Sequence, residues 1–174
     1  GSIQTFDLKQ EGFTIHKATH PELKIHFVGN FDCPFSMISM QNLLQLLARK
    51  KVKYEFTIQF YHMPKSFNEH DLLISLLWQL KDYAKTDWFN FLYQNHAILS
   101  SVNAHELLQQ KVDSSIDIQQ FINTPNLALW NSFYELKNLG INNLPTIFIN
   151  HKMYTGTLTV QQWEELINAE VNFN

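Results

Sequence analysis

Cysteine is almost absent from this chain, which has 174 residues and a single cysteine, Cys33. One cysteine cannot form an internal disulfide, so no disulfide framework holds the fold together. It also excludes zinc sites that are built from several thiolates. Because a free cysteine is among the most buried residue types, a chemical role for Cys33 has to be argued from the residues around it.

Charge is also scarce: only 17% of the residues are charged, the net charge is −3, and the strongest basic cluster is the short run Arg49-Lys50-Lys51. Phosphate binding needs a concentrated basic surface, so nucleic acid is not an expected partner. No apolar stretch approaches the roughly 18 to 20 residues of a membrane span, so we expect no direct membrane insertion of this segment. Hydrophobic residues still make up 45% of the chain, which is enough for a packed core in one domain.

Glycine and metal-binding patterns are missing as well. Five glycines leave little room for a loop that cradles phosphate. His16 and His20 lie in a segment that we interpret as a loop before Pro21, and no acidic residue completes a metal site there. We therefore expect neither a metal nor a cofactor. The first two residues are typical of a cloning scar, so a signal peptide or an anchor upstream of Ser2 is compatible with the sequence.

The residues that are present predict a strand, a helix and a strand in succession. An apolar, β-prone run predicts a strand at 23–28, leucines at helical spacing predict a helix at 34–50, and a second strand is predicted at 54–60. Elements in this order form a right-handed parallel unit.

The second half of the chain is predicted to be mainly helical. Helices are expected at 71–83, 87–97, 104–111, 116–122 and 124–139, the last one beginning at Thr124-Pro125 and ending at Gly140. A strand pair follows at 146–150 and 152–155, and Thr159 caps a final helix that runs to 169. Aromatic residues at helical spacing are interpreted as core: Trp78, Trp88, Phe89, Phe91, Tyr93, Trp130 and Phe133.

Cys33 lies just after a predicted strand and at the start of a predicted helix. A helix N-terminus favours the thiolate over the thiol, because unpaired N–H groups and the positive end of the helix dipole are close to it. The thiolate is the nucleophile in disulfide exchange. Pro34 suits the first helical position, whereas the neighbouring Asp32 opposes ionisation of the thiol. Position alone favours a reactive thiol over a structural cysteine.

Two segments resemble the signatures of DsbA-like thioredoxin-fold proteins. The first is PELKIHFVGNFDCPFS at 21–36, which contains Cys33-Pro34-Phe35-Ser36 where the family normally reads Cys-Pro-x-Cys. The second is GINNLPTIFIN at 140–150, which is similar to the family's cis-proline loop and the strand after it. The resemblance covers roughly residues 21 to 169 and includes a helical segment between the two signatures.

The resemblance implies an α/β, thioredoxin-like fold with a helical insertion. It divides the single domain into an N-terminal segment at 1–20, a first thioredoxin half at 21–64, the insertion at 65–123 and a second half at 124–174. It also implies that Leu144 and Pro145 are joined by a cis peptide bond and face the active-site sulfur, where an extended substrate peptide pairs with the backbone of Leu144.

Two positions depart from the family pattern. Ser36 replaces the second, resolving cysteine, and a hydroxyl cannot break a mixed disulfide from within. Both a natural serine and an engineered Cys→Ser replacement are compatible with the sequence. Phe27 stands six positions before Cys33, where many family members carry a buried acidic residue.

The function implied is that of a thiol–disulfide oxidoreductase or isomerase. Cys33 is the nucleophile, Pro34 and Phe35 shape the turn, and Ser36 is a candidate hydrogen-bond donor to the thiolate. The implied partners are a cysteine-containing protein or peptide and an external thiol or redox partner, in a bacterial periplasmic or extracytoplasmic location. Two alternatives stay open: a non-catalytic peptide-binding module of the same fold, and a kappa-type glutathione transferase.

Overall fold

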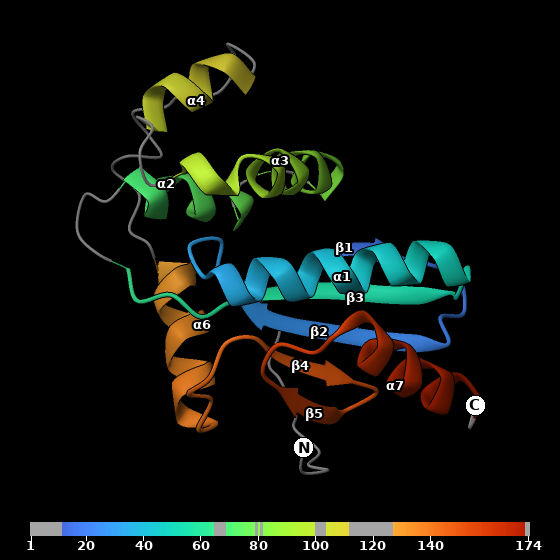
Figure 1. Ribbon diagram of the computed structural model, residues 1–174. Coiled ribbons are helices and arrows are strands. Elements are labelled where there is room, and N and C mark those ends of the chain that lie inside the picture. Colours follow the sequence, from blue (N-terminus) through green and yellow to red (C-terminus); the bar gives the residue numbers. More distant parts are fainter. Residues whose placement is uncertain are drawn as a thin grey trace.

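The computed structural model describes residues 12–64, 69–78, 80, 82–99, 104–111 and 127–172. A five-stranded mixed sheet forms the centre of this part of the chain, with the strand order β1-β3-β2-β4-β5 (Figure 1). The two inner strands β2 and β3 run parallel, and every other neighbouring pair is antiparallel. The strands are β1 (Phe13–Lys17), β2 (Leu23–Gly29), β3 (Tyr54–Phe60), β4 (Thr146–Ile149) and β5 (Lys152–Thr155).

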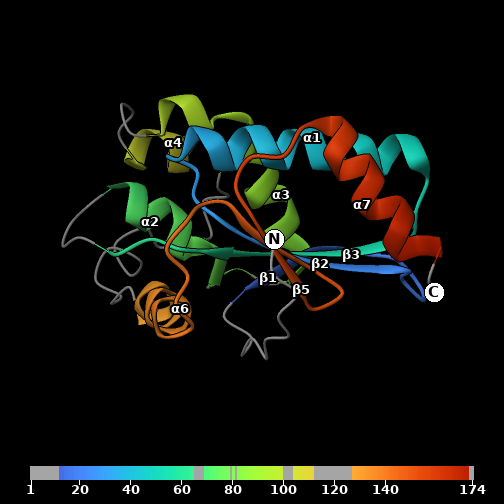
Figure 2. The ribbon, with the colours of Figure 1, turned by 60° about the horizontal axis from the view of Figure 1, so that its bottom comes forward.

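Helices cover both faces of the sheet. Helices α1 (Pro34–Lys50) and α7 (Val160–Asn172) lie together on one face, and α6 (Leu127–Asn138) lies on the other (Figure 2). The helical insertion between β3 and α6 is drawn above α1 and the edge strand β1 in Figure 1, and α3 contacts β1. Its described elements are α2 (Glu69–Ser75), the 3-10 helices η1 (Leu76–Trp78) and η2 (His96–Ile98), α3 (Asp82–Gln94) and α4 (Ala104–Lys111).

Strand alternation creates two cores. Phe27 on β2 and Phe56 and Ile58 on β3 are fully buried in the main core, which also contains buried side chains of α1, α7 and the insertion. The alternate residue Val28 belongs to a second, smaller cluster with Leu136 of α6. Burying a side chain of this size contributes roughly 1.5–3 kcal/mol, so the inner strands, apolar on both faces, are the most strongly held part of the sheet.

The ends of the two helices on the main face follow standard capping chemistry. Helix α1 begins at Pro34, immediately after its N-cap residue Cys33, and ends before Lys51, which has a positive φ of 56°. Helix α7 begins with a capping box, in which the Thr159 hydroxyl accepts from the Gln162 N–H at 3.1 Å and the Gln162 side chain accepts from the Thr159 N–H at 2.9 Å.

Several sequence predictions match the structure, including the bounds of α1, β3, α4 and β5. The α/β fold class is confirmed. The prediction that His16 lies in a loop is wrong, because residues 13–17 form the edge strand β1, which pairs with β3. The predicted helices at 71–83 and 87–97 are misplaced, because α2 ends at Ser75 and α3 already begins at Asp82. The predicted helix at 116–122 and the helix start at 124–126 lie outside the described residues.

Candidate active site

Cys33 lies at the carboxyl end of β2, as the N-cap residue of α1. Its backbone is extended, with φ −100° and ψ 109°, and the residue is partly exposed. The Cys33 carbonyl accepts from the Met37 N–H at 3.1 Å, and the Cys33 N–H donates to the Asn30 carbonyl at 3.3 Å. The thiol therefore lies beside the unpaired N–H groups of the first helical turn, where negative charge is favoured.

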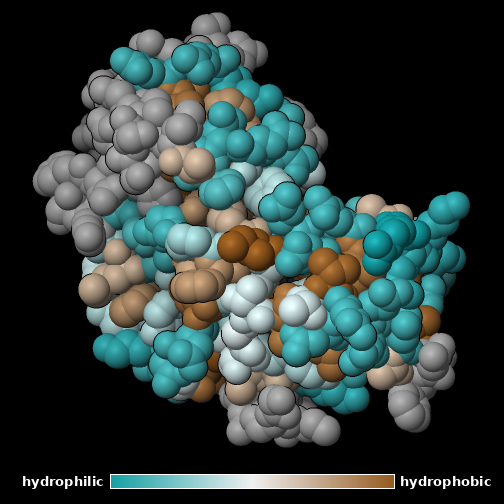
Figure 3. All heavy atoms as spheres, viewed as in Figure 1, coloured by the Kyte–Doolittle hydropathy of each residue, from teal (hydrophilic) through white to brown (hydrophobic). Residues whose placement is uncertain are grey.

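Large apolar side chains are exposed in the first turns of α1 and in the loop after β3. Phe35 and Ile38 on α1 are 60% and 48% exposed, and Met63 in the loop after β3 is 52% exposed. On the face seen in Figure 3, apolar side chains reach the surface in separate patches between polar ones. Phe35, the second residue after Cys33, therefore contributes apolar surface close to it in the sequence.

Ser36 lies one turn into α1 and is fully buried. Its hydroxyl has no hydrogen-bond partner among the described residues. The side chain packs against the backbone of Gly29 so closely that a Cβ added there would lie 2.8 Å from Ser36 Oγ. Position 36 is therefore inside the protein, below the more exposed Cys33.

The Leu144–Pro145 segment lies at the same end of the sheet as Cys33. Strands β2 and β4 pair Val28 with Thr146, so one further step brings Pro145 opposite Gly29. The Leu144–Pro145 peptide bond is cis, and the Pro145 carbonyl accepts from the Gly156 N–H at 3.1 Å. Within the described part of the chain, the backbone N–H and C=O of Leu144 have no hydrogen-bond partner.

No carboxylate takes the place of the family's buried acid at position 27. Phe27 is fully buried and stacks on Phe56 at a centroid distance of 6.0 Å. On the other face of β2, His26 Nε2 bonds Gln59 Oε1 at 2.8 Å, and Gln59 Nε2 donates to Glu135 Oε1 at 3.0 Å. Burial lowers the pKa of His26, and this effect outweighs the opposite effect of the hydrogen bond that His26 makes to Gln59 Oε1.

Sequence reasoning missed a polar group beside the Cys33 turn. Asn30 contacts His62, which in turn pairs with Asp71 on α2. The signal for the first pair was available, because Asn30 follows β2, His62 follows β3, and the carboxyl ends of parallel strands meet at one edge of a sheet. No sequence pattern indicates that Asp71 lies near this turn, because Asp71 belongs to the helical insertion and does not follow a strand of the sheet.

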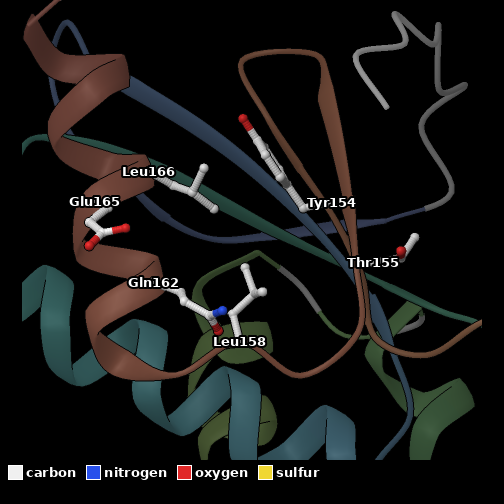
Figure 4. Close-up of a pocket in the computed structure, with 6 residues that line it drawn as sticks. All are labelled: Tyr154, Thr155, Leu158, Gln162, Glu165 and Leu166. Atoms are coloured by element: carbon white, nitrogen blue, oxygen red, sulfur yellow. The ribbon is translucent and has the colours of Figure 1, made fainter. Parts of the chain in front are cut away.

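A pocket of about 250 Å³ lies between β5 and α7 (Figure 4), and one of its lining residues, Thr155, pairs with Thr146, the residue after Pro145. Apolar side chains and the half-buried Tyr154 line it together with the polar ends of Gln162 and Glu165.

In the described ranges, no group of three or more His, Cys, Asp or Glu side chains is arranged to hold a metal ion. None of the described helices has the length and apolar character needed to cross a bilayer.

A family model described as Thioredoxin matches residues 18–169, which is most of the chain. The chain belongs to this thioredoxin family. Among curated proteins, none is significantly similar to it.

Solved structures agree with this thioredoxin-family assignment. BdbD from Bacillus subtilis aligns with a TM-score of 0.71 at 11% identity, covering 99% of this chain and 100% of its own. The alpha-DsbA1 protein of Wolbachia pipientis aligns at 0.69 and 16% identity, covering 95% and 92%. A periplasmic thioredoxin-like protein from Salmonella enterica serovar Typhimurium aligns at 0.65 and 14% identity, covering 93% and 91%. The predicted DsbA-like, thioredoxin-like fold is confirmed.

Proposed function

We propose that this chain is a thiol–disulfide oxidoreductase that acts through Cys33 alone. The observation that supports this most strongly is the position of Cys33, a partly exposed residue at the N-cap of α1. Its access and its place beside unpaired N–H groups are what a nucleophilic thiolate needs. The proposed partners are a cysteine-containing protein or peptide and an external thiol, in a periplasmic or extracytoplasmic location like that of the Salmonella neighbour.

The proposed reaction has two exchange steps. The Cys33 thiolate attacks one sulfur of a substrate disulfide, forms a mixed disulfide and releases the other substrate sulfur as a thiolate. An external thiolate then attacks the substrate sulfur of the mixed disulfide, and Cys33 leaves as a thiolate. The substrate ends with one free thiol and one sulfur bonded to the external thiol. Each step breaks one disulfide and forms one, so no further electron acceptor is required.

Ser36 accounts for the need for an external thiol. Its hydroxyl cannot attack a disulfide, so the mixed disulfide has no internal route to release. We propose that the Ser36 hydroxyl donates a hydrogen bond to the Cys33 thiolate across the first turn of α1 once the thiol is ionised. In this structure the buried hydroxyl has no partner among the described residues. Pro34 and Phe35 shape the turn, and Phe35 adds exposed apolar surface next to the sulfur.

Leu144 and Pro145 are the proposed substrate-binding residues. They reach the end of the sheet at which Cys33 lies, and the backbone groups of Leu144 are unpaired in the described part of the chain. An extended peptide that pairs with Leu144 would lie alongside the sheet with its own cysteine near Cys33.

Intact-mass spectrometry tests the proposal directly. Incubation of the native protein with oxidised glutathione should give one stable adduct on Cys33, and added dithiothreitol should remove it. An adduct that forms only after unfolding would identify Cys33 as a buried core residue and would favour the non-catalytic binding module. Conjugation of glutathione to an electrophile by a Cys33→Ala variant would instead favour the kappa-type transferase, although the burial of the Ser36 hydroxyl argues against it.

The chain offers a matched pair of variants for the role of position 36. Ser36→Cys places a second thiol one helical turn from Cys33 and should shorten the lifetime of the adduct sharply. Ser39→Cys is the control, because Ser39 is equally buried but lies a further turn along α1. Equal adduct lifetimes in the two variants would contradict the proposed role of position 36 as the vacant resolving position.

A further inference from the structure

The loops that follow the parallel strands β2 and β3 are hydrogen-bonded to each other beside Cys33. The Tyr61 N–H donates to the Gly29 carbonyl at 3.2 Å, and Asn30 Nδ2 donates to the Tyr61 carbonyl at 2.7 Å. The Asn30 carbonyl accepts from the Cys33 N–H at 3.3 Å. Asn30 thus joins the loop after β3 to the turn that carries the thiol.

The helical insertion is linked to the same turn by a side-chain pair, His62 and Asp71. His62 Nε2 pairs with Asp71 Oδ1, and the Asp71 side chain is completely inaccessible to solvent while that of His62 is 11% exposed. The other ring nitrogen of His62, Nδ1, lies 3.5 Å from Asn30 Nδ2. A continuous line of polar contacts therefore runs from Asp71 on α2 through His62 and Asn30 to the backbone of Cys33.

The geometry determines where the proton of neutral His62 lies. The Tyr61 carbonyl can only accept, so the Asn30 atom that faces it is the amide nitrogen. The same nitrogen lies 3.5 Å from His62 Nδ1, and because it can only donate, a hydrogen bond between them requires Nδ1 to accept. The imidazole proton consequently lies on Nε2, where Asp71 Oδ1 accepts it. Asp71 selects the tautomer that can hold Asn30.

We propose that His62 and Asp71 are positioning residues for Cys33, acting through Asn30 to hold the thiol at the N-terminus of α1. The inference rests on the proposed function, because it takes Cys33 as the nucleophile. Phe31 adds a second link from the same turn to the insertion, since its buried ring packs on Phe89 of α3 at a centroid distance of 5.6 Å.

The alkylation rate of Cys33 by iodoacetamide, measured against pH on the folded protein, tests the proposal. His62→Leu and Asn30→Ala should slow alkylation at pH 7 roughly two- to five-fold, the range of effect that a helix N-terminus has on a charge. They should also displace the pH profile toward higher pH. Asp71→Leu should behave in the same way, whereas Asp71→Asn should stay close to wild type, because its side-chain oxygen can still accept from His62 Nε2.

A matched control separates positioning from stability. Trp88→Phe removes the bond from Trp88 Nε1 to the Leu73 carbonyl at 2.9 Å, in the same insertion but without touching Asn30. It should lower the melting temperature and leave the alkylation profile unchanged. If His62→Leu and Asn30→Ala also lower the melting temperature without changing the profile, the two residues are structural only and the proposal is overturned.

A measurement on the wild-type protein covers the case in which a variant does not fold. Long-range ¹H–¹⁵N spectra should show neutral His62 protonated on Nε2 and unprotonated on Nδ1, and the opposite tautomer would refute the argument. Failure of this inference is distinct from failure of the proposed function. Cys33 that takes no glutathione adduct in the native wild type defeats the function, whereas a reactive Cys33 with unchanged variant profiles defeats only the positioning role.

Discussion

Replacing Gly29 by alanine tests how tightly the end of β2 packs against the first turn of α1. The new Cβ would lie 2.7 Å from Phe27 Cε1, 2.8 Å from Ser36 Oγ and 3.0 Å from Ser36 Cβ. Unstrained carbon contacts lie at about 3.5–4.0 Å, so both neighbouring side chains, Phe27 and Ser36, would have to move.

Neither neighbour can give way easily. The Phe27 ring is fully buried and stacked on Phe56, and Ser36 is anchored in the first turn of α1. We therefore expect Gly29→Ala to lower the free energy of unfolding by about 1–3 kcal/mol, the usual cost of overpacking a core. In a Ser36→Gly background two of the three close contacts are gone, so the same substitution should cost at least about 0.5 kcal/mol less.

Urea unfolding of the wild type, both single variants and the double variant measures these energies. Because displacement of Ser36 also moves the turn that carries Cys33, Gly29→Ala should slow the formation of the glutathione adduct. A cost below about 0.5 kcal/mol, with no coupling between positions 29 and 36, would refute the packing argument. Lost stability with an unchanged adduct rate would refute only the link to Cys33.

Three further predictions concern stability. Burial lowers the pKa of His26, so the unfolded chain binds a proton near pH 6.5 that the folded chain does not. The free energy of unfolding should therefore fall as the pH drops below neutrality, with a slope of at most about 1.4 kcal/mol per pH unit. His26→Gln should flatten this dependence in urea titrations at several pH values. Thr159→Ala should cost about 0.5–2 kcal/mol by removing the N-cap of α7, read from the urea midpoint, and an unchanged midpoint would contradict the capping box. Ser132→Ala should cost about 1 kcal/mol, because the buried hydroxyl donates to the Phe60 carbonyl at 2.6 Å; thermal unfolding by circular dichroism checks it.

The sequence predicts the first and last residues of an element correctly where residues inside or next to that element mark its ends. Helix α1 begins after a cysteine followed by proline and ends at basic residues, and both signals act within the helix itself. Strand β1 was missed because it is a short edge strand with outward-facing polar residues and a register irregularity between Thr14 and His16. Its alternation of Phe13 and Ile15 with polar residues was the available signal. The break between α2 and α3 was misplaced because no glycine or proline marks it.

In the candidate site, too, some features follow from local sequence motifs and others depend on how distant elements pack. The places of Cys33 and Pro145 followed from motifs that each lie within a few residues of the sequence. The burial of Ser36 against Gly29 and the contact of His62 with Asp71 depend on how separate elements pack, so no local pattern predicts them. Residue types alone could not distinguish the buried Asp71 from an ordinary exposed helix residue.

The different exposures of positions 33 and 36 bear on what the serine does. In a two-thiol exchange cycle the first thiol must reach solvent, whereas the second has only to reach the first. Cys33 is partly exposed and Ser36 is fully buried, which is the difference in access that such a cycle requires of its two positions. Formation of a mixed disulfide needs the first position and its access, and both are present. Its release then depends on an attacking thiolate from outside. In the proposed reaction, the lifetime of the mixed disulfide should therefore follow the concentration of external thiol, whereas an internal resolving cysteine would shorten it at every thiol concentration.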